Sequence, residues 1–311
     1  MTSIFKRIPN MHGLWLALIM LCATSTSSAQ NLVYNAQEAE KALGFDPGIT
    51  YVPQENDNEP IICAHGFGHY GQWYQNNAHL FKKSLIAFNF SDRAFFNPKT
   101  SFLGKLWAGY SINLGQERDV KTLLFVLKTC VQNGFKKVHA FGHSRGAATW
   151  IRALHVLEMP TNVENALILK TVGIDEAMRN NIKNMLVPGS IILTSPLLDL
   201  YSSLNYQMKK TIFSSISRTS AFVAALFIRM ITQCNLWCQK PINLFQELIR
   251  KSRYKFFVSI VPKDDLLGSD HIDTITDLSQ NSQTRLRLLP SGEDHNDIHH
   301  IIQSCHELCR N

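Results

Sequence analysis

The chain of 311 residues lacks an apolar run long enough to cross a membrane. The run LWLALIMLCA at residues 14–23 has ten residues, whereas a membrane-spanning helix needs about 20. It follows two basic residues and precedes the small-residue segment TSTSSAQ, the arrangement of a secretory signal. This order predicts a signal peptide over residues 1–29, cleavage near Ala29, and export of residues 30–311 to the periplasm or the cell exterior.

The sequence also lacks internal repeats, low-complexity segments, and the aromatic platforms and groove motifs of nucleic-acid binders. Nucleic acid is therefore not an expected partner. Of the seven cysteines, six follow the predicted signal, and an even number in an exported chain permits disulfides. Four of them form the units CNLWC and CHELC, and the spacing leaves their pairing open. Cys63, inside an apolar run, is predicted to be a buried free thiol.

Short apolar runs alternate along the chain with longer stretches of helical periodicity. Several runs are apolar almost throughout, as in parallel strands that are covered on both faces. The predicted strands lie at 49–53, 61–64, 85–90, 138–142, 190–195, 255–261 and 285–289. The clearest predicted helices lie at 117–134, 145–158 and 296–309. This alternation predicts an α/β chain with a doubly wound, mostly parallel sheet.

One segment breaks the alternation. Residues 201–253 show two or three helical patterns and no strand, which indicates a helical cap inserted between two strands. From 201 to 255 the chain carries nine basic residues and one acidic residue, beside the apolar run FVAALFIRMI. Basic charge next to an apolar helix is typical of an element that contacts an anionic membrane surface, or of a lid over an acyl site. Packing of the apolar face on the sheet, with charge that only aids solubility, is the alternative.

The stretch HAFGHSRGAAT at residues 139–149 contains Gly142, Ser144 and Gly146 in a Gly-x-Ser-x-Gly pattern. A predicted strand precedes Ser144 and a predicted helix follows it, so the serine lies in a sharp strand-to-helix turn. Side chains in place of the two glycines would collide with neighbouring backbone. The amino terminus of the helix would present amide groups to a developing oxyanion. This context predicts that Ser144 is a nucleophile.

A serine nucleophile needs a base and an acid that orients the base. The predicted strand at 255–261 is followed by Asp264 and Asp265, and the last strand by a loop with His295. Upstream, the sequence His-Gly-Phe-Gly follows a strand directly, so the Phe67 amide can join the Arg145 amide as an oxyanion donor.

These four features, in this order and each at a strand end, resemble the α/β-hydrolase superfamily over residues 31–310. The resemblance implies a serine hydrolase that cleaves a carboxylic ester, with a small-molecule or lipid substrate and thioesters as a further option. It implies a triad of Ser144, His295 and Asp264, the acid loop matching better at Asp264 than at Asp265. It also implies that no cofactor and no metal are needed. The loop departs from the family in lacking the usual glycine before the acid, where Pro262 stands.

Several alternatives remain for individual residues. The aspartate pair could cap a helix instead, and Asp199 in TSPLLDL is the main rival acid. His299, His300 and His306 compete with His295 as the base, whereas His65 and His69 are expected to shape the oxyanion loop. The Arg145 side chain could contact an acidic group of the substrate or serve as a structural ion-pair partner.

Two functions of other classes also stay open. The carboxyl-terminal segment at 293–309 carries His295, His299, His306, Cys305 and Cys309 at spacings that could hold zinc. A metal site there would leave the turn at Ser144 and the His-Gly loop unexplained. A non-catalytic binding protein on the same fold is the other alternative, because fold alone does not determine function.

Overall fold

The structure is a computed structural model, and it describes part of the chain. The described residues are 32–55, 57–67, 71–92, 101, 114–211, 240–261, 264, 267, 269–280, 285–289 and 302. Contacts between Cα atoms divide the chain into Met1–Gln30 and Asn31–Asn311, and every described residue belongs to the second unit. The predicted signal peptide lies outside the described residues and stays a prediction.

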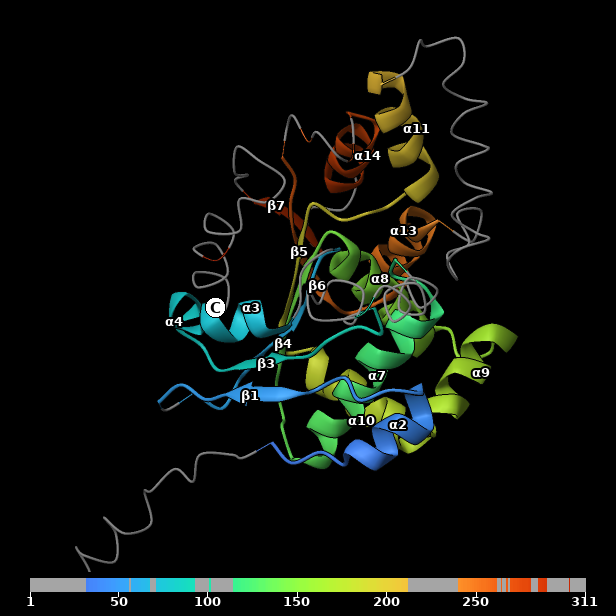
Figure 1. Cartoon of the computed structure of the whole chain (residues 1–311). Coiled ribbons are helices and arrows are strands. Elements are labelled where there is room, and N and C mark those ends of the chain that lie inside the picture. Colours follow the sequence, from blue (N-terminus) through green and yellow to red (C-terminus); the bar gives the residue numbers. More distant parts are fainter. Residues whose placement is uncertain are drawn as a thin grey trace, which may run out of the picture. The chain divides into compact units, whose positions relative to one another are not determined.

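A seven-stranded sheet organises the second unit (Figure 1). Its order is β1-β3-β2-β4-β5-β6-β7, with β1 antiparallel to β3 and all other neighbours parallel. The strands are β1 Thr50–Val52, β2 Ile61–Ala64, β3 Leu85–Ala87, β4 His139–His143, β5 Ser190–Thr194, β6 Lys255–Ser259 and β7 Leu286–Leu289. All seven strands predicted from the sequence are confirmed, β3 being the one that is markedly shorter than expected.

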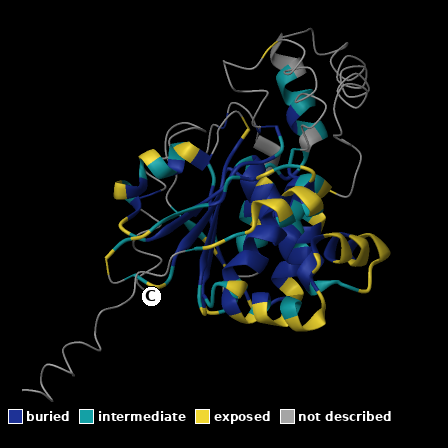
Figure 2. Ribbon diagram, turned by 60° about the horizontal axis from the view of Figure 1, so that its bottom comes forward, coloured by how far each residue is buried: buried dark blue, intermediate teal, exposed yellow. Residues whose placement is uncertain are grey.

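Side chains of alternate residues along each strand enter two cores, one on each face of the sheet. Ile62 and Ala64 of β2 belong to the larger core, while Ile61 and Cys63 belong to the smaller one. Cys63 is buried and is not in a disulfide, as predicted, and its thiol donates to the Ile61 carbonyl at 3.9 Å. Figure 2 shows that the central strands are buried and that the outer faces of the helices carry the exposed residues. The parallel strands are apolar almost throughout because helices cover both faces.

Different described helices cover the two faces of the sheet (Figure 1). The described helices are α2 Ala36–Leu43, α3 Gly71–Asn76, α4 Ala78–Phe81, α7 Glu117–Gln132, α8 Arg145–Glu158, α9 Val163–Val172, α10 Glu176–Leu186, α11 Leu200–Thr211, α13 Pro241–Lys251 and α14 Ser269–Gln280. The short helices α3 and α4 contribute Tyr74, Ala78 and Phe81 to the smaller core. Helices α2, α7, α8, α9, α10, α13 and α14 contribute to the larger core.

The predicted helices at 117–134 and 145–158 are confirmed as α7 and α8. The sequence did not single out α9 and α10, which lie between α8 and β5. Asn162 and Asp175 begin these two helices, because their side chains accept hydrogen bonds from backbone amides of the first turn. The predicted helix at 296–309 lies outside the described residues except for Ile302, which is buried in the smaller core.

The predicted cap segment at 201–253 contains α11 and α13, and residues 212–239 lie outside the described part. Helix α13 packs against α8 and buries Leu244, Phe245, Leu248 and Ile249 in the larger core. It is therefore part of the layer that covers the sheet. Among the described helices, none has both the length and the apolar character needed to cross a membrane.

Candidate active site

Ser144 occupies the turn between β4 and α8 in a strained backbone conformation. Its φ of 50° and ψ of −111° are unusual for a residue with a side chain. The Ser144 N–H donates to the Thr194 carbonyl of β5 at 2.8 Å, which ties the turn to the neighbouring strand. The residue is half-buried, at the edge of the sheet where the parallel strands end. The predicted strand–turn–helix context of the serine is confirmed.

Both glycines of the turn are required by their neighbours. A Cβ on Gly146 would lie 2.0 Å from the Ala64 carbonyl oxygen, and one on Gly142 would lie 2.8 Å from the Cα and N of Ala147. These contacts are far inside van der Waals distance, and the atoms concerned are backbone. A side chain at either position would therefore collide with backbone, as expected from the sequence. The absence of a side chain at Gly146 allows α8 to lie close against β2.

The loop after β2 lies directly against this turn. A Cβ on Gly66 would be 2.8 Å from His143 Cδ2 and 3.5 Å from Ser144 Cβ, so the Gly66 backbone is packed over the serine. His143 is buried, and its Nδ1 lies 3.0 Å from Thr194 Oγ1. Gly68 and His69, which follow in this loop, lie outside the described residues.

His65 is buried and binds backbone on both sides of its ring. The Phe90 N–H donates to Nε2 at 3.3 Å, so Nε2 is an acceptor and the ring proton is on Nδ1. Nδ1 lies 2.9 Å from the Gly66 carbonyl oxygen and donates to it. His65 is thus a neutral residue of the loop structure, which agrees with the expectation that it shapes the loop.

The Arg145 backbone and side chain point to different environments. Its N–H is the first amide of α8 and has no acceptor among the described residues, as expected at a helix amino terminus. The guanidinium is fully buried and forms ion pairs with Asp92 and Asp119. These two carboxylates keep the pKa of Arg145 above its ordinary value, although burial alone would lower it. Of the two roles considered for this side chain, the structural ion pair is the one observed.

The two candidate acids differ in what their oxygens bind. Asp264 follows β6, is buried, and accepts the Leu267 N–H at 2.8 Å through Oδ1. Asp199 follows β5 and caps α11, accepting from the Ser202 N–H at 3.1 Å and from the Ser202 hydroxyl at 2.8 Å. It also pairs with Lys240. Burial acts to raise the pKa of Asp199, but the hydrogen bonds from Lys240 and Ser202 outweigh it and lower the pKa.

Several predicted residues lie outside the described part of the chain. They are Asp265, His69, His295, His299, His300, His306, Cys305 and Cys309. The structure therefore does not place the base. Within the described ranges, no three His, Cys, Asp or Glu side chains gather as metal ligands would. The zinc alternative for the carboxyl-terminal helix concerns residues beyond these ranges.

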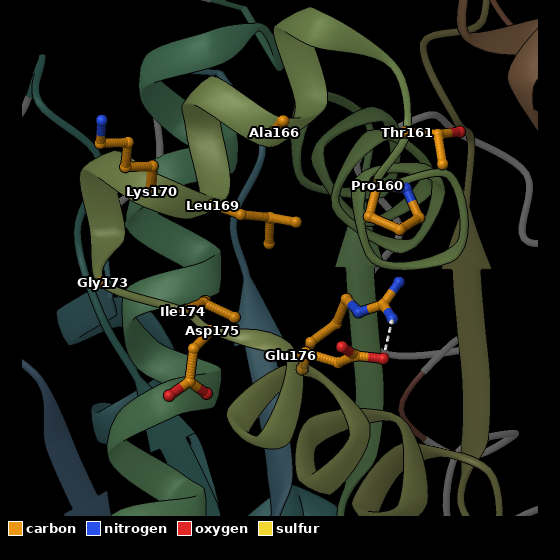
Figure 3. Close-up of a pocket in the computed structure, with 10 residues that line it drawn as sticks. Pro160, Thr161, Ala166, Leu169, Lys170, Gly173, Ile174, Asp175 and Glu176 are labelled. Atoms are coloured by element: carbon orange, nitrogen blue, oxygen red, sulfur yellow. Dashed lines mark ion pairs between the residues drawn. The ribbon is translucent and has the colours of Figure 1, made fainter.

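One hollow among the described residues does not lie at this turn. It has a volume of about 740 Å³ and lies around the links that join α8, α9 and α10 (Figure 3). Its lining residues are Pro160, Thr161, Ala166, Leu169, Lys170, Gly173, Ile174, Asp175, Glu176 and Arg179. Pro160 follows the last residue of α8, whereas Ser144 precedes the first. A helix of 14 residues separates the two places by roughly 20 Å, so this hollow is not the substrate site of Ser144.

The sequence did not reveal the side chains that support the turn. Asp92 and Asp119 are separated from Arg145 by 53 and 26 residues, and no local spacing connects them. The signal that was present is the position of Arg145 at the start of a buried helix, where an unpaired guanidinium would be costly. His143 and Thr194 likewise meet only because β4 and β5 are neighbours.

No protein-family model matches the sequence, and no curated protein matches it either. Solved structures do match. A thermophilic esterase from Thermogutta terrifontis, with butyrate bound, superposes with a TM-score of 0.51 at 13% identity, covering 91% of each chain. An esterase from Pyrococcus furiosus has a TM-score of 0.50 at 14% identity and covers 87% of this chain and 94% of its own. The chain has the α/β-hydrolase fold, as the resemblance in its sequence predicts.

Proposed function

We propose that the chain is a serine hydrolase that cleaves carboxylic esters through an acyl-enzyme on Ser144. His295 is the base and Asp264 the acid that orients it. The Phe67 and Arg145 amides donate hydrogen bonds to the oxyanion. The strained conformation of Ser144 between β4 and α8, in an α/β-hydrolase fold, is the observation that carries this proposal.

In the proposed reaction, Ser144 Oγ attacks the ester carbonyl carbon while His295 takes the hydroxyl proton. The carbonyl oxygen becomes an oxyanion in front of the amino terminus of α8, whose dipole and first amide favour negative charge. His295 then gives its proton to the departing alcohol. A water molecule, activated by the same histidine, releases the acid and restores Ser144.

The choice of Asp264 as the acid rests on its burial and on its position in the strand order. Both oxygens of Asp199 hold Ser202 or Lys240, so that side chain is engaged at the start of α11. Asp264 is buried after β6, one strand closer to the loop of His295. A triad acid needs a buried position next to the base, which favours Asp264.

Ester substrates are favoured because both structural relatives are named as esterases, one with butyrate bound. The proposal leaves acyl length open between small soluble esters and lipids. A series of p-nitrophenyl esters of rising chain length measures this preference directly.

Export after cleavage near Ala29 is part of the same proposal, and sequencing the amino terminus of material from outside the cytoplasm tests it. Retention of Met1 on cytoplasmic protein would contradict export.

The experiment for the proposed chemistry is labelling with a fluorophosphonate together with ester turnover. The wild-type protein is expected to be labelled at Ser144 and to hydrolyse p-nitrophenyl esters in the presence of a chelator. Ser144→Ala should lose labelling and lower kcat by several orders of magnitude, roughly 10⁴ or more, with unchanged circular dichroism. A folded Ser144→Ala protein with near-normal turnover contradicts the proposal.

A further inference from the structure

A set of three buried charges lies directly behind the nucleophile turn. Arg145 Nε and Nη2 donate to the two oxygens of Asp119 at 2.7 Å and 2.6 Å, and Nη1 donates to Asp92. All three side chains are at most 1% exposed. Asp119 Oδ2 also accepts the Gly115 N–H at 2.6 Å. The planar guanidinium is thereby held in one orientation by a bidentate pair and a third bond.

Arg145 is the residue whose own N–H is the proposed first oxyanion donor. Its carbonyl oxygen accepts the Thr149 hydroxyl at 2.9 Å within α8. The side chain is anchored to Asp119 in the first turn of α7 and to Asp92 beyond β3. The ion pairs therefore fix the first residue of α8 against α7 and against the segment that follows β3.

The same guanidinium also contacts residues that lie between it and the second proposed oxyanion donor, the Phe67 amide. Its Cζ atom lies over the Phe90 ring at 4.6 Å from the centroid, and that ring packs on the His65 ring at 4.6 Å between centroids. The Phe90 N–H donates to His65 Nε2, and His65 Nδ1 donates to the Gly66 carbonyl.

The Gly66 carbonyl belongs to the peptide unit whose N–H is that of Phe67. In a trans peptide the C=O and N–H of one unit point in opposite directions, and none of the described peptide bonds is cis. A hydrogen bond that fixes the Gly66 carbonyl therefore also fixes the direction of the Phe67 N–H. A continuous series of contacts through Phe90 and His65 therefore connects the Arg145 residue to the Phe67 amide.

We propose that Arg145, Asp92 and Asp119 position the oxyanion hole, aligning the Arg145 amide directly and the Phe67 amide through Phe90 and His65. These are positioning residues, since none of their side chains touches the substrate in this scheme. The inference rests on the proposed serine-hydrolase function. It adds that the arginine in the Gly-His-Ser-Arg-Gly turn acts through its buried side chain as well as through its backbone.

A positioning role has a kinetic consequence that a purely structural role lacks. The oxyanion exists only near the transition state, so misaligned donors lower kcat and leave substrate binding nearly unchanged. Loss of one donor costs roughly 10²–10³ in kcat. Partial misalignment through a supporting side chain should cost less, on the order of 10- to 100-fold.

Two single variants and one control test the inference. Arg145→Lys keeps the charge but loses the bidentate fork, and Phe90→Leu keeps an apolar side chain but removes the ring between Arg145 and His65. Phe245→Leu is the control, because Phe245 is also fully buried in the larger core but lies in α13. Each protein is titrated with a fluorophosphonate so that kcat is expressed per active site, and the affinity for an aryl boronic acid is measured as a transition-state mimic.

We expect Arg145→Lys and Phe90→Leu to lower kcat per active site by about 10- to 100-fold, with KM within about twofold. Binding of the boronic acid should weaken by a similar factor. Phe245→Leu should lower the melting temperature and leave kcat per active site unchanged. The triple variant Arg145→Met, Asp92→Asn, Asp119→Asn, which leaves no unpaired buried charge, should show the same loss of kcat as Arg145→Lys.

Wild-type kcat per active site in Phe90→Leu, or in the folded triple variant, would overturn the inference. A lower fraction of active sites that react with the fluorophosphonate, or a lower melting temperature, with unchanged kcat per active site would also overturn it. Those are the effects expected if the three charged side chains only stabilise the fold. Failure of the proposed function has a different signature, since the wild-type protein would then neither react with the fluorophosphonate nor hydrolyse the esters.

Discussion

At the scale of single residues, Asp199 and Asp264 show how burial and existing partners separate two similar carboxylates. The Asp199 oxygens bind Ser202 and Lys240, which stabilise the start of α11. Asp264 is 3% exposed and follows β6. An aspartate that orients a catalytic histidine is expected to lie in such a buried position at a strand end.

The acid is identified by comparing three asparagine variants. Asp264→Asn should lower kcat on the order of 10⁴, because the histidine loses the partner that fixes its tautomer. Asp199→Asn should leave kcat near the wild-type value and lower stability by at most about 1 kcal/mol, because asparagine caps a helix as well as aspartate does and only the partly exposed pair with Lys240 loses its charge. Asp265→Asn serves as the adjacent control, with little effect on kcat. Steady-state kinetics and urea unfolding separate these outcomes, and a crippling effect of Asp199→Asn alone would move the acid to β5.

His139, at the start of β4, is a second residue whose environment determines its protonation. Its Nδ1 accepts the Ser190 N–H at 3.1 Å, which requires an unprotonated nitrogen. Burial, followed by the charges of Lys83 and Lys137, lowers its pKa to about 4, and the carboxylate of Glu59 opposes this only in part. Glu59 lies 3.6 Å from His139 Nε2, a distance that is long for a strong hydrogen bond.

This histidine predicts sensitivity to acid. Because its pKa is lower in the folded chain than its ordinary value of 6.5, the unfolded chain binds the proton more tightly and stability falls as the pH drops below 6.5. The expected loss is about 2 kcal/mol between pH 7 and pH 5. Urea unfolding at the two pH values should show it. His139→Asn should remove most of this dependence, and an unchanged slope would contradict the assignment.

At the scale of elements, the contact between α8 and β2 depends on the absence of a side chain at Gly146. A Cβ there would overlap the Ala64 carbonyl at 2.0 Å, and Ala64 ends the strand that leads into the His-Gly loop. Relief of this overlap requires α8 to move away from β2. That movement would separate the two proposed oxyanion donors, since Arg145 begins α8 and Phe67 lies in the loop that follows β2.

Gly146→Ala should therefore be severely destabilising, by more than about 4 kcal/mol. Gly44→Ala is the matched control, because Gly44 has a φ of +79° but a Cβ added to it would meet no atom within 4 Å. It should cost only the backbone strain of a left-handed alanine, about 1 kcal/mol. Thermal unfolding of the two variants measures the difference, and equal losses would show that the close approach of α8 to β2 is unimportant.

The elements also show why some of this fold could be predicted from the sequence and some could not. The central strands β2 to β5 were recognisable because both of their faces are buried, which makes the runs largely apolar. Helix α9 was not, because Val163 and Leu167 are 85% and 59% exposed and blur its apolar stripe. The turn at Ser144 was predicted from a local pattern. The pairing of Arg145 with Asp92 and Asp119, and the engagement of Asp199, depend on contacts between distant segments.

At the scale of the whole chain, the structure shows where the described part of the basic segment at 201–255 lies. Helix α13 begins beside the carboxyl end of β5, where the Ile242 N–H donates to the Leu198 carbonyl at 3.4 Å. It ends shortly before β6 begins, so it runs back along the sheet. Four of the nine bases therefore lie near the amino-terminal ends of the parallel strands, whereas Ser144 lies at their carboxyl ends. All four are exposed: Arg250, Lys251, Arg253 and Lys255.

A fifth cation joins this basic edge. Arg285 is exposed, and its Nη1 donates to the carbonyls of Ile249 and Arg250, both at 2.9 Å. Glu247 is the acidic residue in the segment, and it pairs with Lys251 at 2.7 Å. A flat anionic membrane in contact with these bases would lie on the side of the sheet away from the proposed active site. A cap that contacts lipid next to Ser144 would have to use other bases of the segment.

Replacement of Arg250, Lys251, Arg253 and Lys255 by glutamine separates these two arrangements. Each cation near an anionic surface contributes about 1 kcal/mol, so the fourfold variant should bind anionic vesicles at least about 100-fold more weakly at low salt. The control replaces four exposed lysines that are scattered over the fold, Lys41, Lys82, Lys136 and Lys170. It removes the same net charge and should weaken binding much less, because only clustered cations meet the surface together. Sedimentation with phosphatidylglycerol and phosphatidylcholine vesicles measures both. Equal weakening by the two variants would show that binding depends on net charge alone. Undiminished binding by the variant of the clustered bases would show that other bases of the cap segment contact the lipid.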